Sequence, residues 1–88
     1  MGELSELPNI GKVLEEQLNS VGISTKEELR NVGAEKAWLK IQAIDSSACI
    51  HRLLALEGAI EGTKKSFLSD EVKKELKQFY EKNKISSK

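Results

Sequence analysis

The stretch that decides the fold is Ser47-Ala-Cys-Ile-His-Arg-Leu-Leu-Ala-Leu-Glu-Gly-Ala-Ile-Glu-Gly62. Spaced at about 100° per residue around a helix, its large apolar side chains form one broad arc and its alanines and glycines form a second. A helix that is apolar or small nearly all round is typical of a buried centre. We therefore predict a central helix over Ser47–Gly62, in which Gly58 and Gly62 are structural positions where another helix approaches closely.

The same helix carries Glu57 on its apolar arc, between Leu53 and Ile50. A buried carboxylate needs partners. We expect Glu57 to be partly buried and to accept hydrogen bonds from backbone amides or from a basic side chain, which would make it an internal anchor. The residues before the helix, Asp45-Ser46-Ser47, are predicted to supply its polar caps.

Outside this stretch, apolar residues recur at the spacing of helices, and Pro8 is the only proline. A short turn over Leu4–Leu7 is predicted before Pro8. Thr25 and Glu28 have the spacing of a capping box, which predicts a short helix ending near Arg30. The remaining apolar stripes predict three longer helices: Ile10, Val13, Leu14, Leu18 and Val21; Ala34, Ala37, Trp38 and Ile41; and, after Ser69, Val72, Leu76, Phe79 and Tyr80.

The size and composition set limits on the fold. Eighty-eight residues, 39% of them apolar, are enough for one core and too few for two. We predict an all-α fold: a single compact domain of about five helices over residues 1–82, followed by a frayed tail over residues 83–88. The front half of this domain is expected to be helix-hairpin-helix-like, which is also described as SAM-domain-like.

Charge is balanced overall but not along the chain. The 14 basic and 14 acidic residues give a net charge of zero, with −4 over residues 1–62 and +4 over residues 63–88. No general attraction to nucleic acid or anionic lipid follows from such a balance. The best candidate basic face is Lys73, Lys74 and Lys77, near Lys64 and Lys65, and a solvated charged face explains these lysines equally well.

A short pattern, Leu-x-Asn-apolar-Gly, occurs twice, at Leu7–Gly11 and at Leu29–Gly33. A glycine at such a corner permits a tight turn and leaves the amides of the next helix free for a phosphate. The pattern resembles the helix-hairpin-helix motif of DNA-binding proteins, with Asn where that motif usually has an earlier glycine; asparagine tolerates a positive φ. The candidate phosphate or partner contacts are Asn9, Gly11, Lys12, Asn31, Gly33 and Lys36.

An alternative interpretation is that both corners are only tight helix connections. Acidic residues flank them, whereas phosphate binding depends on basic side chains. These acidic neighbours are Glu15, Glu16, Glu27, Glu28 and Glu35.

Residues able to carry catalysis are few. His51 is the only histidine and Cys49 the only cysteine, and two residues apart on a helix they project from different sides. Trp38 lies on an aliphatic stripe and is predicted to be core, although a lone aromatic residue can stack a base. We predict no catalytic residue, no cofactor and no metal site. A single cysteine and the absence of a signal peptide near Met1 indicate the cytoplasm.

Taken together, the chain resembles the C-terminal domain of the TfoX family, the competence regulators also called Sxy. The resemblance covers about residues 6–80, and its most specific part is Leu53-Leu-Ala-Leu-Glu-Gly-Ala-Ile-Glu-Gly62. Three further strings match: Leu7-Pro-Asn-Ile-Gly11, Val21-Gly-Ile-Ser-Thr-Lys-Glu-Glu-Leu29, and Val32-Gly-Ala34 with Ala37-Trp38. Full-length family members carry another domain ahead of this one, outside these 88 residues.

What the resemblance implies is a regulatory module linked to transcription and DNA uptake. We predict a noncatalytic interaction module that contacts a protein partner, such as transcription machinery or a regulator, and DNA weakly at most. The competing hypothesis is a DNA-binding helix-hairpin-helix module whose backbone amides at Gly11 and Gly33 meet duplex phosphates. No membrane partner is expected, because no stretch approaches the length of a membrane span. The oligomeric state is left open.

Overall fold

The computed structural model describes residues 3–83, and all regular structure within them is helical. The prediction of an all-α fold with five helices is confirmed. In chain order the elements are η1 (Glu3–Glu6), α1 (Lys12–Ser20), α2 (Lys26–Val32), α3 (Ala34–Ile44), α4 (Ile50–Glu61), η2 (Lys65–Phe67) and α5 (Asp70–Asn83). The radius of gyration, 12.0 Å, matches the value of about 12 Å for one compact domain of this length.

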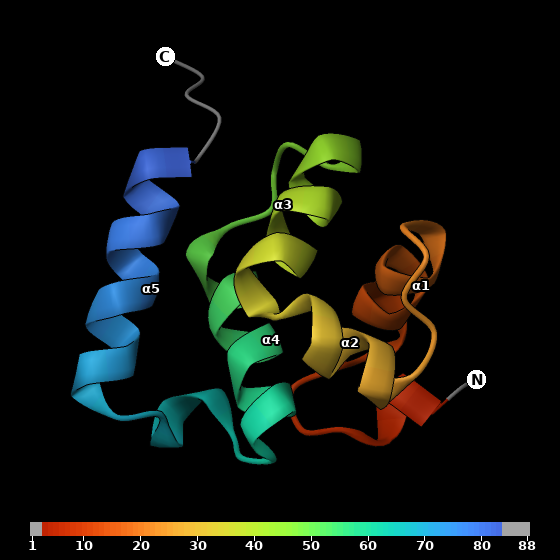
Figure 1. Ribbon diagram of the computed structural model, residues 1–88, viewed down its shortest axis with the longest axis horizontal. Helices are drawn as coiled ribbons and strands as arrows, with labels where there is room; N and C mark the ends of the chain where they lie inside the picture. Colours follow the sequence, from red (N-terminus) through yellow and green to blue (C-terminus); the bar gives the residue numbers. More distant parts are fainter. Residues whose placement is uncertain (1–2, 84–88) are drawn as a thin grey trace.

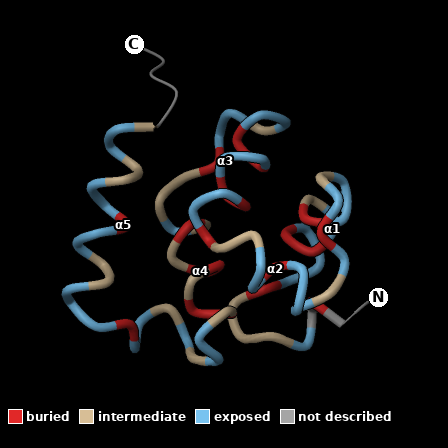
Figure 2. Tube along the Cα trace, viewed as in Figure 1, coloured by how far each residue is buried: buried red, intermediate tan, exposed pale blue. Residues whose placement is uncertain are grey.

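Helix α4 lies in the middle of the molecule, as its sequence predicts, with α5 on one side and α1 on the other (Figure 1). It packs against α2, α3, α5 and η2. Figure 2 shows buried residues gathered in α4 and in parts of α1 and α3, whereas α5 is mostly exposed. In α5 only Leu76 is fully buried among the described residues.

Trp38 belongs to the core, as predicted. Its side chain has no exposed surface, and it makes edge-on contacts with Phe79 and Tyr80 of α5 at ring-centroid distances of 6.1 and 5.5 Å. Its indole Nε1 donates a hydrogen bond of 3.2 Å to the backbone carbonyl of Cys49. Because a buried indole satisfies its one donor in this way, Trp38 joins α3, α4 and α5 and is closed to base stacking.

Helix α4 begins at Ile50, three residues later than predicted, and its N-cap is Cys49, whose side chain makes no capping hydrogen bond. The predicted caps are used elsewhere. Asp45 accepts hydrogen bonds from the backbone amide and hydroxyl of Ser47. This local turn competes with the helix for the same polar groups, which delays the start of α4.

Two other predicted starts are confirmed. Thr25 and Glu28 form a complete capping box at α2, with the Glu28 amide donating to Thr25 Oγ1 at 3.1 Å. At α5 the Val72 amide donates to Ser69 Oγ at 3.2 Å. Short polar side chains at these positions satisfy amides that the first turn of a helix leaves free.

The predicted stripe of α1 is wrong at one position, because Val13 is 66% exposed and Glu15 is buried instead. At 3.6 residues per turn, Glu15 lies about 80° from the middle of the Leu14–Leu18 stripe and Val13 about 120°. The position nearer the stripe is the one that the fold covers, regardless of its polarity.

The frayed tail predicted over residues 83–88 stays a prediction. Asn83 is the last residue of α5, and its backbone carbonyl accepts a hydrogen bond of 3.0 Å from Gln42 Nε2. Residues 84–88 lie outside the described residues.

Candidate functional site

Asn9 attaches the first Leu-x-Asn-apolar-Gly corner, Leu7–Gly11, to the rest of the fold through its side-chain hydrogen bonds. This residue has a φ of 71°, the left-handed conformation that asparagine tolerates. Its side-chain Nδ2 donates to the backbone carbonyls of Thr63 at 3.0 Å and Ala55 at 3.5 Å, and its Oδ1 accepts from the Lys65 amide at 3.1 Å. Both of its donors are therefore used within the fold rather than offered to a phosphate or partner.

Gly58 of α4 lies directly beneath this corner. A Cβ at Gly58 would lie 2.5 Å from Asn9 Nδ2 and 2.7 Å from the Thr63 carbonyl oxygen. The closest neighbours of Gly58 are thus the Asn9 turn and the loop that follows α4. We had expected a neighbouring helix at this position. Gly62 has no such neighbour and ends α4 in a left-handed conformation, with a φ of 79°.

The exposed part of the first corner is Gly11 and Lys12. Gly11 is the N-cap of α1 in an extended conformation, and no side chain caps the helix there. Of the three first-corner candidates, these two remain accessible to a partner.

The second corner has a different structure. Asn31 is exposed within α2, and Gly33 alone connects α2 to α3, with φ 89° and ψ 154°. The Gly33 amide closes α2 by donating to the Leu29 carbonyl at 2.8 Å, and the Gly33 carbonyl opens α3 by accepting from the Ala37 amide at 2.9 Å. The sequence repeat is therefore not a structural repeat.

A pocket of about 320 Å³ opens beside this second corner, between the start of α3, α4 and α5. Gly33 and Lys36 line it together with apolar side chains from three helices, namely Val32, Ala34, Val72 and Leu76. The pocket joins residues about 40 positions apart in the sequence, and the sequence analysis missed it for that reason.

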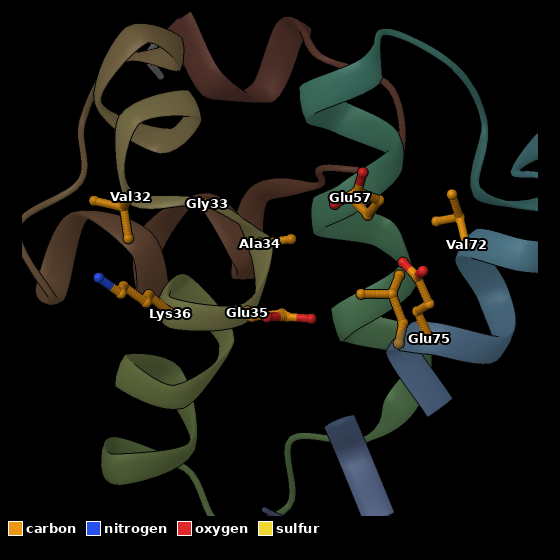
Figure 3. A pocket seen from close by; sticks show the side chains of 9 residues that line it. Val32, Gly33, Ala34, Glu35, Lys36, Glu57, Val72 and Glu75 are labelled. Carbon is orange, nitrogen blue, oxygen red and sulfur yellow. The ribbon is translucent and has the colours of Figure 1, made fainter. Parts of the chain in front are cut away.

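Three carboxylates face this pocket: Glu35 from α3, Glu57 from α4 and Glu75 from α5. Figure 3 shows them directed into the space between the helices, whereas the Lys36 ammonium points away from them. Within residues 3–83, no basic side chain forms a salt bridge with any of the three. The second corner is thus bordered by negative charge, which opposes phosphate binding.

Glu57 is half-buried, as predicted. The prediction that backbone amides or a basic side chain would stabilise its carboxylate is wrong. Burial, a hydrogen bond with Glu61, and the negative charges of Glu61, Glu35 and Glu75 raise the pKa of Glu57 to about 7. A carboxylate anchored by amides or by a cation would have a lowered pKa. Glu57 therefore borders the pocket without a compensating charge.

Asp45 is the opposite case. Hydrogen bonds from the Ser47 side chain, from Gln17 Nε2 at 2.8 Å, from the Ser47 amide and from Arg52 at 3.0 Å hold the pKa of Asp45 well below its usual range. The fold thus stabilises the charged form of Asp45 with hydrogen-bond donors, whereas it surrounds Glu57 with other acidic side chains.

The candidate basic face is only partly free. Lys73 Nζ donates to the Ser66 carbonyl at 3.2 Å, whereas Lys74 and Lys77 are exposed. The latter two border a shallow hollow along α5 with Phe79 and with acidic neighbours, Glu75 among them. Their helix face is therefore mixed in charge.

Chemistry-bearing residues do not converge elsewhere in the described part of the chain. His51 is exposed and Cys49 is the half-buried N-cap of α4. Among residues 3–83, no three His, Cys, Asp or Glu side chains are placed to hold a metal ion. None of the helices in this range is both long and apolar enough to cross a membrane.

These observations define the class of the protein: a small all-helical domain built around a buried helix, with two dissimilar glycine corners. The chain belongs to the TfoX C-terminal domain family, which it matches over residues 1–80. The resemblance found in the sequence is confirmed.

Relatives agree with this assignment. Protein Sxy of Escherichia coli (strain K12) is 36% identical over 76 residues, which are 86% of this chain and 36% of that protein. The chain thus spans about a third of that relative's length. An uncharacterized protein from Listeria monocytogenes, solved in a triclinic form, is 51% identical, with a TM-score of 0.89 over 90% of each chain. A tetragonal form of a Listeria monocytogenes protein of unknown function has 51% identity and a TM-score of 0.88, over 90% of this chain and 96% of that one.

Proposed function

We propose that the chain is a noncatalytic regulatory interaction module of the competence-regulator kind, which acts through a protein partner and contacts DNA weakly at most. The observation that carries this proposal is the state of the two corners. The Asn9 side chain makes its hydrogen bonds within the fold, to the backbone of Thr63 and Lys65. The second corner borders three carboxylates. A corner of this kind favours a partner other than the phosphate backbone of DNA.

The proposed partner belongs to the transcription machinery or is one of its regulators, and the proposed location is the cytoplasm. Membership of the TfoX C-terminal domain family and the likeness to Protein Sxy support both. Cys49 is the half-buried N-cap of α4 and His51 is exposed in its first turn, an arrangement that we take to favour a noncatalytic role.

A second candidate is a helix-hairpin-helix DNA-binding module. Gly11 and Lys12 favour it, because they are exposed at an uncapped helix start where amides are free for an anion. On this hypothesis Lys12 and Lys36 contact phosphates on either side of the corners.

Fluorescence anisotropy with a labelled duplex, at low and at physiological salt, separates the two candidates. The proposal predicts a dissociation constant no tighter than about 10⁻⁴ to 10⁻⁶ M at physiological salt. Submicromolar binding that weakens in Lys12→Glu and Lys36→Glu would establish the DNA-binding module instead. Loss of residual binding only in Lys73→Glu and Lys77→Glu would place a weak contact on α5.

A pull-down with the purified domain from the source cell tests the protein side. Recovery of a transcription protein that survives nuclease treatment is the expected result. Recovery that disappears when nucleic acid is digested would contradict the proposal, because the contact would then run through DNA or RNA.

A further inference from the structure

The pocket between α3, α4 and α5 has the shape and walls of a side-chain receptor. Its volume, about 320 Å³, lies at the small end of the range of about 300 to 1,000 Å³ that ligand pockets span. Val72 and Leu76 of α5 give it one apolar wall, and Val32 and Ala34 give it another. Such walls fit an unbranched aliphatic chain.

Its charge is one-sided. From the elements packed around it come Glu35 and Lys36 on α3, Glu57 and Glu61 on α4, and Glu75 on α5. The one basic side chain among these, Lys36, points away from the carboxylates in Figure 3. A ligand that carries positive charge would therefore relieve a repulsion that the fold leaves uncompensated.

A metal ion does not fit this description, because no three acidic side chains among residues 3–83 are close enough to share one. An aliphatic stem that ends in a cation fits both features. Lysine and arginine side chains have this form: they bury their methylene groups against apolar surface and keep a charged end for carboxylates.

Building on the proposed function, we infer that the pocket receives a lysine or arginine side chain of the protein partner. Its stem lies against Val72 and Leu76, and its charged end lies among Glu35, Glu57 and Glu75. The partner surface is thus basic at this point, complementary to the acidic pocket.

The inference makes binding depend on pH. The pKa of Glu57 is raised to about 7, so its carboxyl is about one-tenth ionised at pH 6 and about nine-tenths ionised at pH 8. A bound cation favours the ionised form and displaces the proton. Affinity should therefore rise from pH 6 to pH 8, by about tenfold at most.

Two small probes test this with the 88-residue chain. N-acetyl-arginine methylamide carries the cation, and N-acetyl-citrulline methylamide is its neutral isostere. Each is titrated against the ¹⁵N-labelled protein at pH 6 and pH 8, and amide shifts are followed by NMR. The expected result is saturable shifts at Gly33, Glu35, Glu57 and Val72 with the arginine probe, stronger at pH 8, and no saturable shifts with citrulline.

Variants show which residues are responsible. Glu57→Gln and Glu75→Gln should each weaken arginine binding several-fold, and Glu57→Gln should also abolish the difference between pH 6 and pH 8. Glu16→Gln, an exposed position on α1 away from the pocket, removes the same charge and should leave binding unchanged. Glu75 is exposed, so its variant is expected to fold like the parent protein even if Glu57→Gln does not.

Several outcomes would overturn the inference: equal binding of arginine and citrulline probes, equal affinity in Glu75→Gln and Glu16→Gln, or an affinity that is flat between pH 6 and pH 8. Tighter binding of putrescine than of the arginine probe would assign the pocket to a free polyamine. Any of these results would remove the pocket's role and leave the proposed function standing, whereas submicromolar duplex binding would remove the proposed function independently.

Discussion

Leu7–Gly11 and Leu29–Gly33 share a five-residue pattern and differ in almost every structural respect. In the first, Asn9 takes the positive φ and its side chain joins the corner to Thr63 and Lys65. In the second, the asparagine is an exposed helical residue and the glycine takes the positive φ. The residue with a positive φ is therefore the third of the pattern in the first corner and the fifth in the second.

The residue in the x position explains the difference. Pro8 disfavours a helical conformation at the residue before it and has no amide to donate, so η1 ends at Glu6 and an irregular turn follows. Arg30 imposes no such restriction, so α2 continues to Val32. A shared pattern therefore specifies a corner only when the variable position is also compatible with it.

The sharpest way to break the first corner is at Gly58. Gly58→Leu places a side chain where Asn9 and the Thr63 carbonyl already lie, and overpacking of this kind should destabilise the protein by about 3 kcal/mol. Urea unfolding measures the change. An unchanged free energy of unfolding would mean that the Asn9 turn is not seated on α4.

The two asparagines should differ next. Asn9→Ala removes three hydrogen bonds and leaves the Thr63 carbonyl and Lys65 amide without their partner, for an expected loss of about 2 kcal/mol. Asn31→Ala, at an exposed helical position, should change stability by less than about 0.5 kcal/mol. Equal effects in thermal unfolding would contradict the structural difference between the corners.

The two glycines should differ in the opposite sense. Gly33→Ala forces a Cβ into φ 89° and ψ 154°, a conformation reserved for glycine, and should cost about 1 to 2 kcal/mol. Gly11→Ala meets no atom within 4 Å and has an ordinary φ of −95°, so it should be neutral or slightly stabilising. A destabilised Gly11→Ala protein with an unaffected Gly33→Ala protein would reverse the comparison.

The smallest expected effect concerns pH, and it belongs to the second corner, where Gly33 and Glu57 line the same pocket. Folding raises the pKa of Glu57 from its ordinary value of 4.5 to about 7, so folding favours the protonated form. Its contribution to stability is complete below pH 4.5 and is lost as the pH rises through about 7. Because the side chain is only half-buried, solvent screening limits the loss to about 1 kcal/mol.

Glu57→Gln should remove this part of the pH dependence of the free energy of unfolding. The loss of stability caused by Asn9→Ala should be the same with and without Glu57→Gln. Urea unfolding of both proteins at pH 5 and pH 8 measures it. A Glu57→Gln protein whose stability still falls between these pH values as steeply as the parent's would show that other groups cause the change.

Much of the fold follows from local sequence. An arc of large apolar residues that includes Leu53 and Leu56, with a second arc of alanines and glycines, predicted the buried central helix. The spacing of Thr25 and Glu28 predicted the start of α2. The site was less predictable. Gly33 and Lys36 were recognised as candidates, but their neighbours Glu35 and Glu75 in the pocket were not considered together, since nothing in the local pattern relates α3 to α5.

The sequence by itself determined the helices, the central place of α4 and the burial of Trp38, because periodicity and capping act within one or two helical turns. Only the tertiary structure decided the rest. Asn9, a candidate partner contact in the sequence, forms hydrogen bonds within the fold to residues 46 to 56 positions away. The packing of the helices also places Glu57 near the negative charges of Glu35 and Glu75. Hydrogen bonds and charge repulsion depend on distances in space, and the packing of separate helices sets those distances.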